Sequence, residues 1–302
     1  MQRRRLLIIG CGDVAQRAVP WLAKRFKVYA LTRTPESAAS LRQLGVTPIM
    51  GNLDDAASLA RLAGVAEWVL HSAPPPNAGT DDARTHHLLA ALARGAILPR
   101  GFVYISTTGV YGDCVGTRID ETRPCHPESA RAQRRVTAEA ALRAWGRRHG
   151  GVAILRAPGI YAADRLPIER IRQGSPALLP EEDGYSNHIH ADDLAHAAAL
   201  ALFRGRTNRV YNTCDDTEWK MGDWFDRVAD AYALPRPPRL SRVAMQANVS
   251  PALWSFMRES RRIANGRLKD ELKLRLRHPT PDGLLASLSA GLGSVHTIVP
   301  GK

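Results

Sequence analysis

The 302-residue sequence lacks several features that would assign the protein to a specialised class. No apolar run approaches the roughly 20 residues that a membrane-spanning helix needs. The apolar run after the first arginines stops at Gly10, too soon for a secretory signal. The four cysteines form no Cys-x-x-Cys pair, so the sequence indicates neither a disulfide framework nor a zinc site. We therefore expect a cytoplasmic protein with no bound metal and no membrane contact.

Acidic residues are few compared with basic ones. The chain has 29 Asp or Glu against 42 Lys or Arg, a formal net charge of +13. Between Arg236 and Arg277, eleven basic residues stand against three acidic ones. No aromatic stacking pattern or nucleic-acid motif accompanies them, so we expect a solvated basic face and no nucleic-acid partner. The alternative is an electrostatic funnel for phosphorylated or carboxylated ligands. The part from Leu253 to Leu276 is predicted to be helical, covering a substrate cleft or packing on a second subunit.

What the sequence does contain is a glycine-punctuated turn at its start. An apolar run of strand length, Leu6 to Ile9, meets a Gly-x-Gly-x-x-Ala turn, and helix-forming residues follow at once. Such a turn needs small residues so that the backbone can approach a pyrophosphate and the helix can pack on the strand. The free N–H groups of the helix start then face the phosphates. The predicted diphosphate-binding residues are Gly10, Gly12, Asp13, Val14 and Ala15.

Strand-length and helix-length segments then alternate, which predicts an α/β fold with a Rossmann-type, doubly wound parallel sheet. Ligands bind at the carboxyl ends of such strands, so residues there are candidates for the cofactor. The second strand ends with Arg33 and no carboxylate, which favours the 2′-phosphate of NADP, with NAD as the alternative. Asn52 is positioned to meet an adenine. Further candidates beside the dinucleotide are Leu53, Ala73 and Pro74.

The organisation predicted for the chain has two parts. Residues 1–160 are expected to form the NAD(P)-binding Rossmann domain. Residues 161–302 are expected to form mainly a smaller C-terminal substrate-binding region, with 187–215 returning to the Rossmann core. Helix Met221 to Ala233 should present a core face. His188, His190 and Asp192 alternate as metal ligands sometimes do, but a strand followed by a helix capped by Asp192 is the favoured interpretation.

Six motifs occur in one order over roughly residues 1–215 and carry a resemblance to a known family. The sequence resembles the short-chain dehydrogenase/reductase superfamily, in its extended or atypical branch, which includes nucleotide-sugar epimerases and dehydratases. Its Glu259-Ser-Arg-Arg262 segment is similar to that of an uncharacterised bacterial subgroup. The motifs are Gly10-x-Gly12-x-x-Ala15, Gly51-Asn-Leu-Asp54, Ser106-Thr-Thr-Gly-Val-Tyr-Gly112, Leu155-Arg-Ala-Pro-Gly-Ile-Tyr161, Asn187-His-Ile-His-Ala-Asp-Asp-Leu194 and Val210-Tyr-Asn212.

This resemblance implies a set of catalytic positions. The superfamily uses a Ser or Thr that polarises the substrate, a Tyr as acid and base, and a Lys four residues later that lowers the tyrosine pKa and holds the nicotinamide ribose. Thr107 matches the first position. In this superfamily a glutamate usually follows in the same helix, and Glu139 matches it. Counting back four residues from Glu139 puts the Lys position on Arg135, and four more put the Tyr position on Arg131. Arginine stays protonated, so Arg131 cannot exchange a proton, whereas Arg135 is still able to hold the ribose.

The resemblance also implies cofactor contacts beyond the first motif. Ser106 lies at the mouth of the cofactor crevice, at the end of the fifth strand. The backbone of the turn after the sixth strand approaches the nicotinamide amide, which makes Pro158, Gly159 and Ile160 cofactor-binding candidates.

Two functions remain open at this stage. One is an NAD(P)-dependent oxidoreductase or epimerase/dehydratase-like enzyme acting on an anionic small molecule, which Arg131 clamps, with the proton donor relocated to Tyr111, Tyr161 or His190. For Tyr111, the alternative interpretation is that its side chain only packs the turn in which it lies. The other is a non-catalytic dinucleotide sensor, which the absent Tyr–Lys pair fits equally well. A homodimer is the default expectation for a soluble enzyme.

Overall fold

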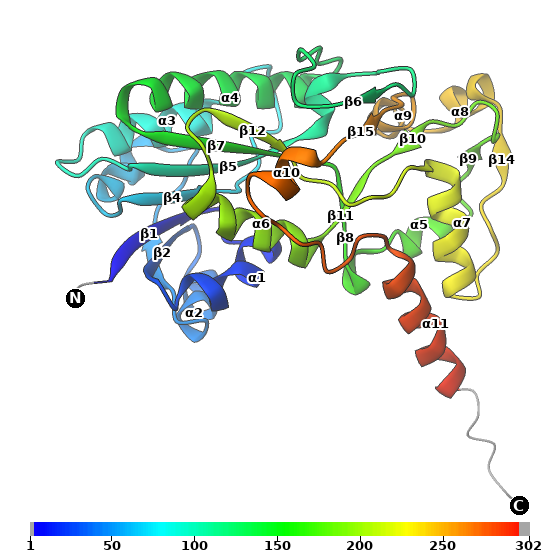
Figure 1. The fold of residues 1–302 in the computed structure, drawn as a ribbon, viewed down its shortest axis with the longest axis horizontal. Helices are drawn as coiled ribbons and strands as arrows, with labels where there is room; N and C mark the ends of the chain where they lie inside the picture. The colour runs from blue at the N-terminus through cyan, green and yellow to red at the C-terminus, as the bar shows by residue number, and fades with distance from the viewer. Residues whose placement is uncertain (1–2, 296–302) are drawn as a thin grey trace, which may run out of the picture.

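The computed structural model describes residues 3–295, and its centre is a seven-stranded sheet (Figure 1). Every pair of neighbouring strands is parallel, and the strand order reverses between β1 and β4. This confirms the predicted doubly wound α/β sheet. Across the sheet the strands are β12 (Arg209–Asn212), β7 (Gly151–Ala157), β5 (Gly101–Thr107), β4 (Trp68–His71), β1 (Arg4–Ile9), β2 (Phe26–Thr32) and β3 (Thr47–Met50).

Helices cover both faces of the sheet, because the central strands are apolar on both sides. In β1, Leu6 and Ile8 join one core cluster, and Leu7 and Ile9 join the other. All four side chains are fully buried. The first cluster contains residues from α1 (Asp13–Leu22), α2 (Pro35–Gln43) and α6 (Ala191–Arg204). The second contains residues from η1 (Ala56–Leu62), α3 (Ala83–Ala93) and α4 (Ala130–His149).

Shorter elements build the region to the right of the sheet in Figure 1. Its strands occur in pairs, such as β8 with β11, and it includes helix α7, whose Trp224 and Phe225 are buried as predicted. These elements are η2 (Thr108–Tyr111), β6 (Arg118–Ile119), β8 (Gly159–Tyr161), η3 (Ala163–Arg165), α5 (Ile168–Arg172), β9 (Ala177–Leu178), β10 (Tyr185–Ser186), β11 (His188–His190), β13 (Trp219–Lys220), α7 (Met221–Ala231), β14 (Arg239–Leu240), α8 (Arg242–Asn248), α9 (Pro251–Met257), β15 (Arg262–Ile263), α10 (Gly266–Asp270) and α11 (Asp282–Val295).

The structure corrects two predictions about local structure. The segment from Leu253 to Leu276 is not one helix, since it contains the end of α9, then β15 and then α10. Asp192 is not the cap of α6 either. His190 is the N-cap, and its Nδ1 accepts a hydrogen bond from the Asp192 backbone N–H at 3.2 Å. Within the described residues, no helix is both long and apolar enough to cross a bilayer.

The basic segment Arg236–Arg277 is largely neutralised by contacts within the chain. Among the described residues, seven of its eleven cations form ion pairs, such as Arg258 with Glu128 at 2.9 Å and Arg239 with Asp226 at 2.6 Å. The full set of paired cations is Arg236, Arg239, Arg258, Arg261, Arg262, Arg267 and Lys269. The local charge excess therefore overstates the free positive charge of this segment.

Candidate dinucleotide site

The glycine turn between β1 and α1 brings two strand ends into close contact. Gly10 has a φ of +84°, and a Cβ on it would lie 2.4 Å from the backbone nitrogen of Ala73. The hydroxyl of Ser72 donates to the Gly10 carbonyl at 2.7 Å. Gly12 is different, because a Cβ there would meet no atom within 4 Å. Gly10 is therefore required by the fold, whereas Gly12 leaves open space in front of the helix.

A cavity of about 520 Å³ begins at this turn and continues along the ends of β2 and β4. None of its lining residues is acidic, and two are arginines, Arg33 and Arg84. Seven predicted cofactor residues line it: Gly10, Gly12, Arg33, Asn52, Leu53, Ala73 and Pro74. Residues that line it without having been predicted include Cys11, Gln16, Thr34, Ser37, Ser40, Gly51, Ser72 and Arg84.

Arg84 is the most informative of the residues that the sequence did not reveal. Its guanidinium donates to both carboxylate oxygens of Asp54, at 2.6 and 2.7 Å, and to the Pro74 carbonyl at 3.1 Å. The hydrogen bond from Arg84 lowers the pKa of Asp54. These contacts join the start of α3 to the loops that follow β3 and β4. No local pattern marks Arg84, because its partner lies 30 positions away in the chain.

The other predicted cofactor residues do not line this cavity. Ala15 is buried where α1 packs on the sheet, which is the packing role of a small residue in this motif. Asp13 starts α1 and forms ion pairs. Gly159 and Ile160 belong to β8, which pairs with β11. Val14 and Pro158 likewise lie outside the lining.

Ser106 was predicted to contact the cofactor, but in the structure its side chain forms a hydrogen bond within the core. Its hydroxyl donates to Glu139 Oε1 at 2.7 Å, and the side chain is buried. The two carboxylate oxygens of Glu139 also accept from Arg156, at 3.0 and 2.6 Å. Burying a charged pair is unfavourable unless its hydrogen-bonding groups are satisfied, and Ser106 contributes to that satisfaction. The O–H donor of Ser106 is therefore engaged within the protein.

Thr107 and Arg135 lie on neighbouring elements at the carboxyl end of β5. Thr107 is the cap of η2, and its Oγ1 accepts from the Gly109 backbone N–H at 3.2 Å. Accepting this bond leaves the O–H free to donate. Arg135, in α4, donates to the Tyr104 hydroxyl at 2.8 Å and to the Ile105 carbonyl at 3.1 Å. The guanidinium is therefore held against β5.

Arg131 lies in the first turn of α4 in an unusually cationic setting. Arg131, Arg134 and Arg135 all occupy the first two turns, and the first turn has no acidic residue. Cations are unfavourable at a helix N-terminus, where the helix dipole is positive. Burial lowers the pKa of Arg131. The charge of Glu259 opposes this shift, and the guanidinium groups of Arg134 and Arg261 add to it. The Arg131 guanidinium stacks on the exposed ring of Phe256 in α9, with Arg131 Cζ 3.6 Å from the ring centroid.

The structure does not support Tyr111 as a proton donor. Its side chain is fully buried, and its hydroxyl donates to Asn212 Oδ1 at 2.7 Å. Burial raises the pKa of Tyr111 to about 12, and the Arg156 guanidinium lies 4.7 Å from its ring. The residue therefore packs the turn that follows β5, as the competing interpretation held.

Tyr161 is also buried, in the core beside α7 rather than in an open crevice. Burial raises its pKa further, and the charge of Asp215 acts in the same direction. Asp215 itself is buried, and burial raises its pKa to about 7. A buried phenol with a raised pKa stays protonated and is a weak acid, so Tyr161 is a poor proton donor for a substrate outside this core.

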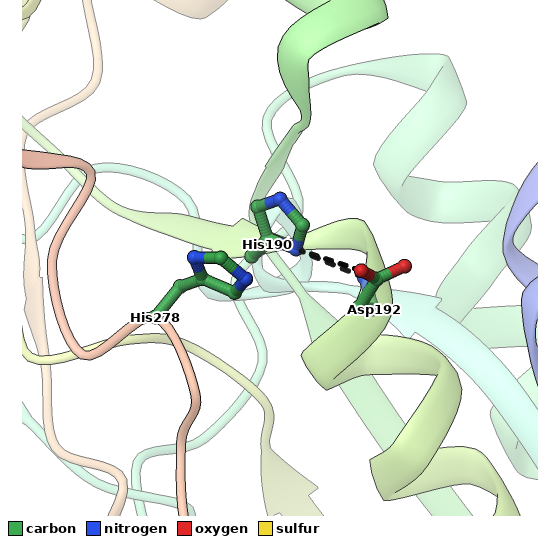
Figure 2. A group of neighbouring side chains, drawn as sticks. All are labelled: His190, Asp192 and His278. Carbon is green, nitrogen blue, oxygen red and sulfur yellow. Dashed lines mark hydrogen bonds and ion pairs between the residues drawn. The ribbon is translucent and has the colours of Figure 1, made fainter. Parts of the chain in front are cut away.

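His190, Asp192 and His278 form the one group of described residues close enough to suggest a metal site (Figure 2). The two imidazole rings are stacked, with centroids 3.7 Å apart and planes inclined by 22°. A metal ion about 2.0–2.1 Å from both ring nitrogens has to lie near both ring planes, and nearly parallel planes do not meet at that distance. His190 Nδ1 already accepts from the Asp192 backbone, and Asp192 pairs with Arg17 at 2.9 Å. This geometry favours a stacked pair of rings over metal ligation.

The model of the NAD dependent epimerase/dehydratase family matches residues 15–214. The chain belongs to this family. A structure of a functionally unknown conserved protein from Silicibacter pomeroyi DSS is similar over 96% of this chain and 99% of that chain, with a TM-score of 0.78 and 29% identity. UDP-glucose 4-epimerase from Thermotoga maritima has the same fold, with a TM-score of 0.75 at 17% identity over 96% of this chain and 99% of that one.

Curated relatives of this epimerase/dehydratase family member match more locally. Human dTDP-D-glucose 4,6-dehydratase is 26% identical over 136 residues, which is 42% of this chain and 38% of that enzyme. dTDP-glucose 4,6-dehydratase of Streptomyces antibioticus is 25% identical over 209 residues, 63% of this chain and 62% of that enzyme. The chain thus spans well under half the length of the human relative. Family membership supports nicotinamide-dependent chemistry in general and leaves the substrate open.

Proposed function

We propose that the chain binds a nicotinamide dinucleotide in the cavity at the ends of β1, β2 and β4. The observation that carries this proposal is the pairing of two features in one cavity. At one end, Gly10 and Gly12 expose the start of α1, where free N–H groups favour phosphate. At the other end, Arg33 and Asn52 are placed for the adenosine half. A Cβ on Gly12 would meet no protein atom within 4 Å, so the space in front of Gly12 is open to a diphosphate.

The cavity favours NADP over NAD. Arg33 is exposed at the end of β2, and Thr34, Ser37 and Ser40 supply hydroxyl groups on the same wall. A 2′-phosphate is recognised by such donors, whereas a free ribose 2′-hydroxyl usually meets a carboxylate, which this lining lacks. The family description and the related structures leave this choice open, so it belongs to our proposal.

Changing Arg33 tests the choice of dinucleotide. Arg33→Gln should raise the Kd for NADPH by about tenfold or more, because a charge-assisted contact to the 2′-phosphate is lost, and should leave NADH nearly unaffected. Calorimetric titration of both nucleotides measures this ratio. Arg42→Gln, in the helix α2 that follows Arg33 and outside the cavity, is the matched control. Equal losses for NADPH and NADH would contradict the assignment.

We further propose that the chain acts on an anionic small molecule at the end of β5. A bound nicotinamide supplies a hydride donor or acceptor. The Thr107 hydroxyl has its O–H free to polarise a carbonyl or hydroxyl group. Arg131, at the positive end of α4, is suited to bind a carboxylate or phosphate, which would relieve the unfavourable crowding of arginines there.

Two substitutions test this enzymatic role. Thr107→Val and Arg131→Ala should each lower turnover by about a hundredfold in a panel of anionic carbonyl and hydroxyl compounds followed at the nicotinamide absorbance. NADPH binding should be retained in both, because neither residue lines the dinucleotide cavity. Unchanged turnover would remove Thr107 and Arg131 from the chemistry.

A dinucleotide sensor without turnover is the second candidate, and a specific observation favours it. Arg131 and Arg135 occupy the positions where the superfamily has its Tyr and Lys, and the nearby tyrosines Tyr111 and Tyr161 are both buried. Phe256 also covers the Arg131 guanidinium. Tight NADPH binding with no turnover across the panel would favour the sensor over the enzyme.

A further inference from the structure

Two ion pairs join the helix of the glycine turn to the region beyond the sheet. Arg165 in η3 donates from Nη1 to Asp13 Oδ2 at 2.8 Å, and Arg17 in α1 donates from Nη2 to Asp164 Oδ1 at 3.2 Å. The pairs are crossed, since each element supplies one arginine and one aspartate. The partners are 152 and 147 positions apart, so no local pattern in the sequence reveals the contact.

Asp13 is the first residue of α1, where an unpaired carboxylate would repel a diphosphate. Arg17 donates to its other oxygen, Oδ1, at 2.8 Å, so a guanidinium group occupies each oxygen. Burial acts to raise the pKa of Asp13, but the hydrogen bonds from Arg165 and Arg17 outweigh it and lower that pKa. Asp13 is therefore an anchor for two cations at the helix N-terminus.

Arg165 differs from Arg17 because it keeps donors unused. Arg17 directs its three nitrogens to Asp13, Asp164 and Asp192. Among the residues that the structure describes, the Arg165 side chain makes one hydrogen bond, to Asp13, and it is 36% exposed. A guanidinium carries five N–H donors, so one edge remains open to solvent. The N-cap of α1 is Gly12, which has no side chain that could bond to the backbone N–H groups at the helix start.

We propose that Arg165 is a cofactor-binding residue, held by Asp13 beside the N-terminus of α1 so that its free edge donates to the diphosphate of a bound dinucleotide. This inference rests on the proposed dinucleotide site. It adds to the backbone N–H groups of α1 a cation that comes from beyond the sheet. Binding of the dinucleotide then also strengthens the contact between η3 and α1.

The test compares ligands with and without a diphosphate. NADPH and ADP-ribose contain it, whereas adenosine 2′-monophosphate does not. Calorimetric titration should give Arg165→Gln a Kd about tenfold higher for NADPH and ADP-ribose, with the Kd for adenosine 2′-monophosphate unchanged. Arg165→Lys should be intermediate, because an ammonium keeps the charge but not the planar fork. Arg172→Gln, which removes an exposed charge from α5, is the matched control and should change each Kd by less than about twofold.

Thermal unfolding without ligand checks that the variants are folded, and Arg165→Lys decides the question if Arg165→Gln is not. Equal Kd values for Arg165→Gln and Arg172→Gln would overturn the role of Arg165. Equal losses of affinity for adenosine 2′-monophosphate and ADP-ribose in Arg165→Gln would also overturn it. If Arg165→Gln does not fold, a Kd of Arg165→Lys equal to that of the unchanged protein would overturn it. If the unchanged protein binds neither NADPH nor ADP-ribose, the proposed dinucleotide site itself is wrong, and Arg165 has no cofactor to bind.

Discussion

Ser106 and Glu139 show how a residue of a sequence motif is used by the core of this molecule. Ser106 stands in the polar cluster at the end of β5, yet its hydroxyl bonds a carboxylate that also pairs with Arg156. The sequence places Ser106 at the right strand end. Only the three-dimensional arrangement shows which way the side chain faces, because the partners lie 33 and 17 positions apart.

Replacing Ser106 by Ala should therefore affect stability and leave binding unchanged. The variant loses a hydrogen bond to a buried charge, so its free energy of unfolding should fall by about 1.5–3 kcal/mol. Urea unfolding measures this change, and calorimetry should give an unaltered Kd for NADPH. Ser37→Ala, on the wall of the cavity, is the opposite case and should weaken NADPH binding with little loss of stability. A weaker Kd in Ser106→Ala would restore Ser106 to the cofactor site.

Asp215 predicts a pH-dependent difference in stability. Burial raises its pKa to about 7 from an ordinary value of 3.8, so between these values the folded protein keeps a proton that the unfolded chain releases. Stability should therefore fall as the pH rises through this window. Asn is neutral at every pH, and Asp215→Asn should be more stable than the unchanged protein by about 2–4 kcal/mol at pH 8.

The same pair of proteins should converge in acid. At pH 4 and below, Asp215 is protonated in the folded state, and the two free energies of unfolding should become similar. Other buried groups, such as His71 and His188, titrate in both proteins and cancel in the comparison. A stability difference that is the same at pH 4 and pH 8 would mean that Asp215 is charged throughout.

At the scale of elements, the turn between β1 and α1 separates two uses of glycine. Gly10→Ala should destabilise the fold, because the new methyl group would meet Ala73 and φ is +84°. Gly12→Ala should fold normally, since its φ is −86° and the space around it is open, yet its methyl group would stand where the diphosphate approaches. We expect Gly10→Ala to lose at least about 2 kcal/mol of stability, and Gly12→Ala to lose NADPH affinity by about tenfold or more.

Thermal unfolding and calorimetry on the two variants separate these effects. The turn would be misassigned if Gly12→Ala bound NADPH as the unchanged protein does. It would also be misassigned if Gly10→Ala unfolded at the same temperature as that protein.

Element by element, the sequence predicted what depends on local pattern and missed what depends on distant partners. The strands, the glycine turn and the buried face of α7 follow from apolar spacing, and all are present. The prediction that Asp192 caps α6 was wrong, because His190 is the N-cap of this helix. The prediction of a helix from Leu253 to Leu276 was wrong because Arg262 and Ile263 form β15, which pairs with the distant strand β6. Arg84 and Arg165 carried no local signal for the same reason.

For the whole molecule, the distribution of charge matters more than its sum. The net charge of +13 suggested a free basic face, but most cations between Arg236 and Arg277 are paired within the described chain. The dinucleotide cavity has no acidic lining residue, and of its two arginines Arg84 pairs with Asp54, whereas Arg33 is exposed at the end of β2. Positive charge thus remains where an anionic cofactor is expected to bind.

The measurement that tests this account most directly is calorimetric titration of the purified, folded protein with NADPH and NADH. The account predicts that NADPH binds with a stoichiometry near one and clearly tighter than NADH. If neither nucleotide binds at millimolar concentration, the cavity at the ends of β1, β2 and β4 is not a dinucleotide site, and the account is contradicted.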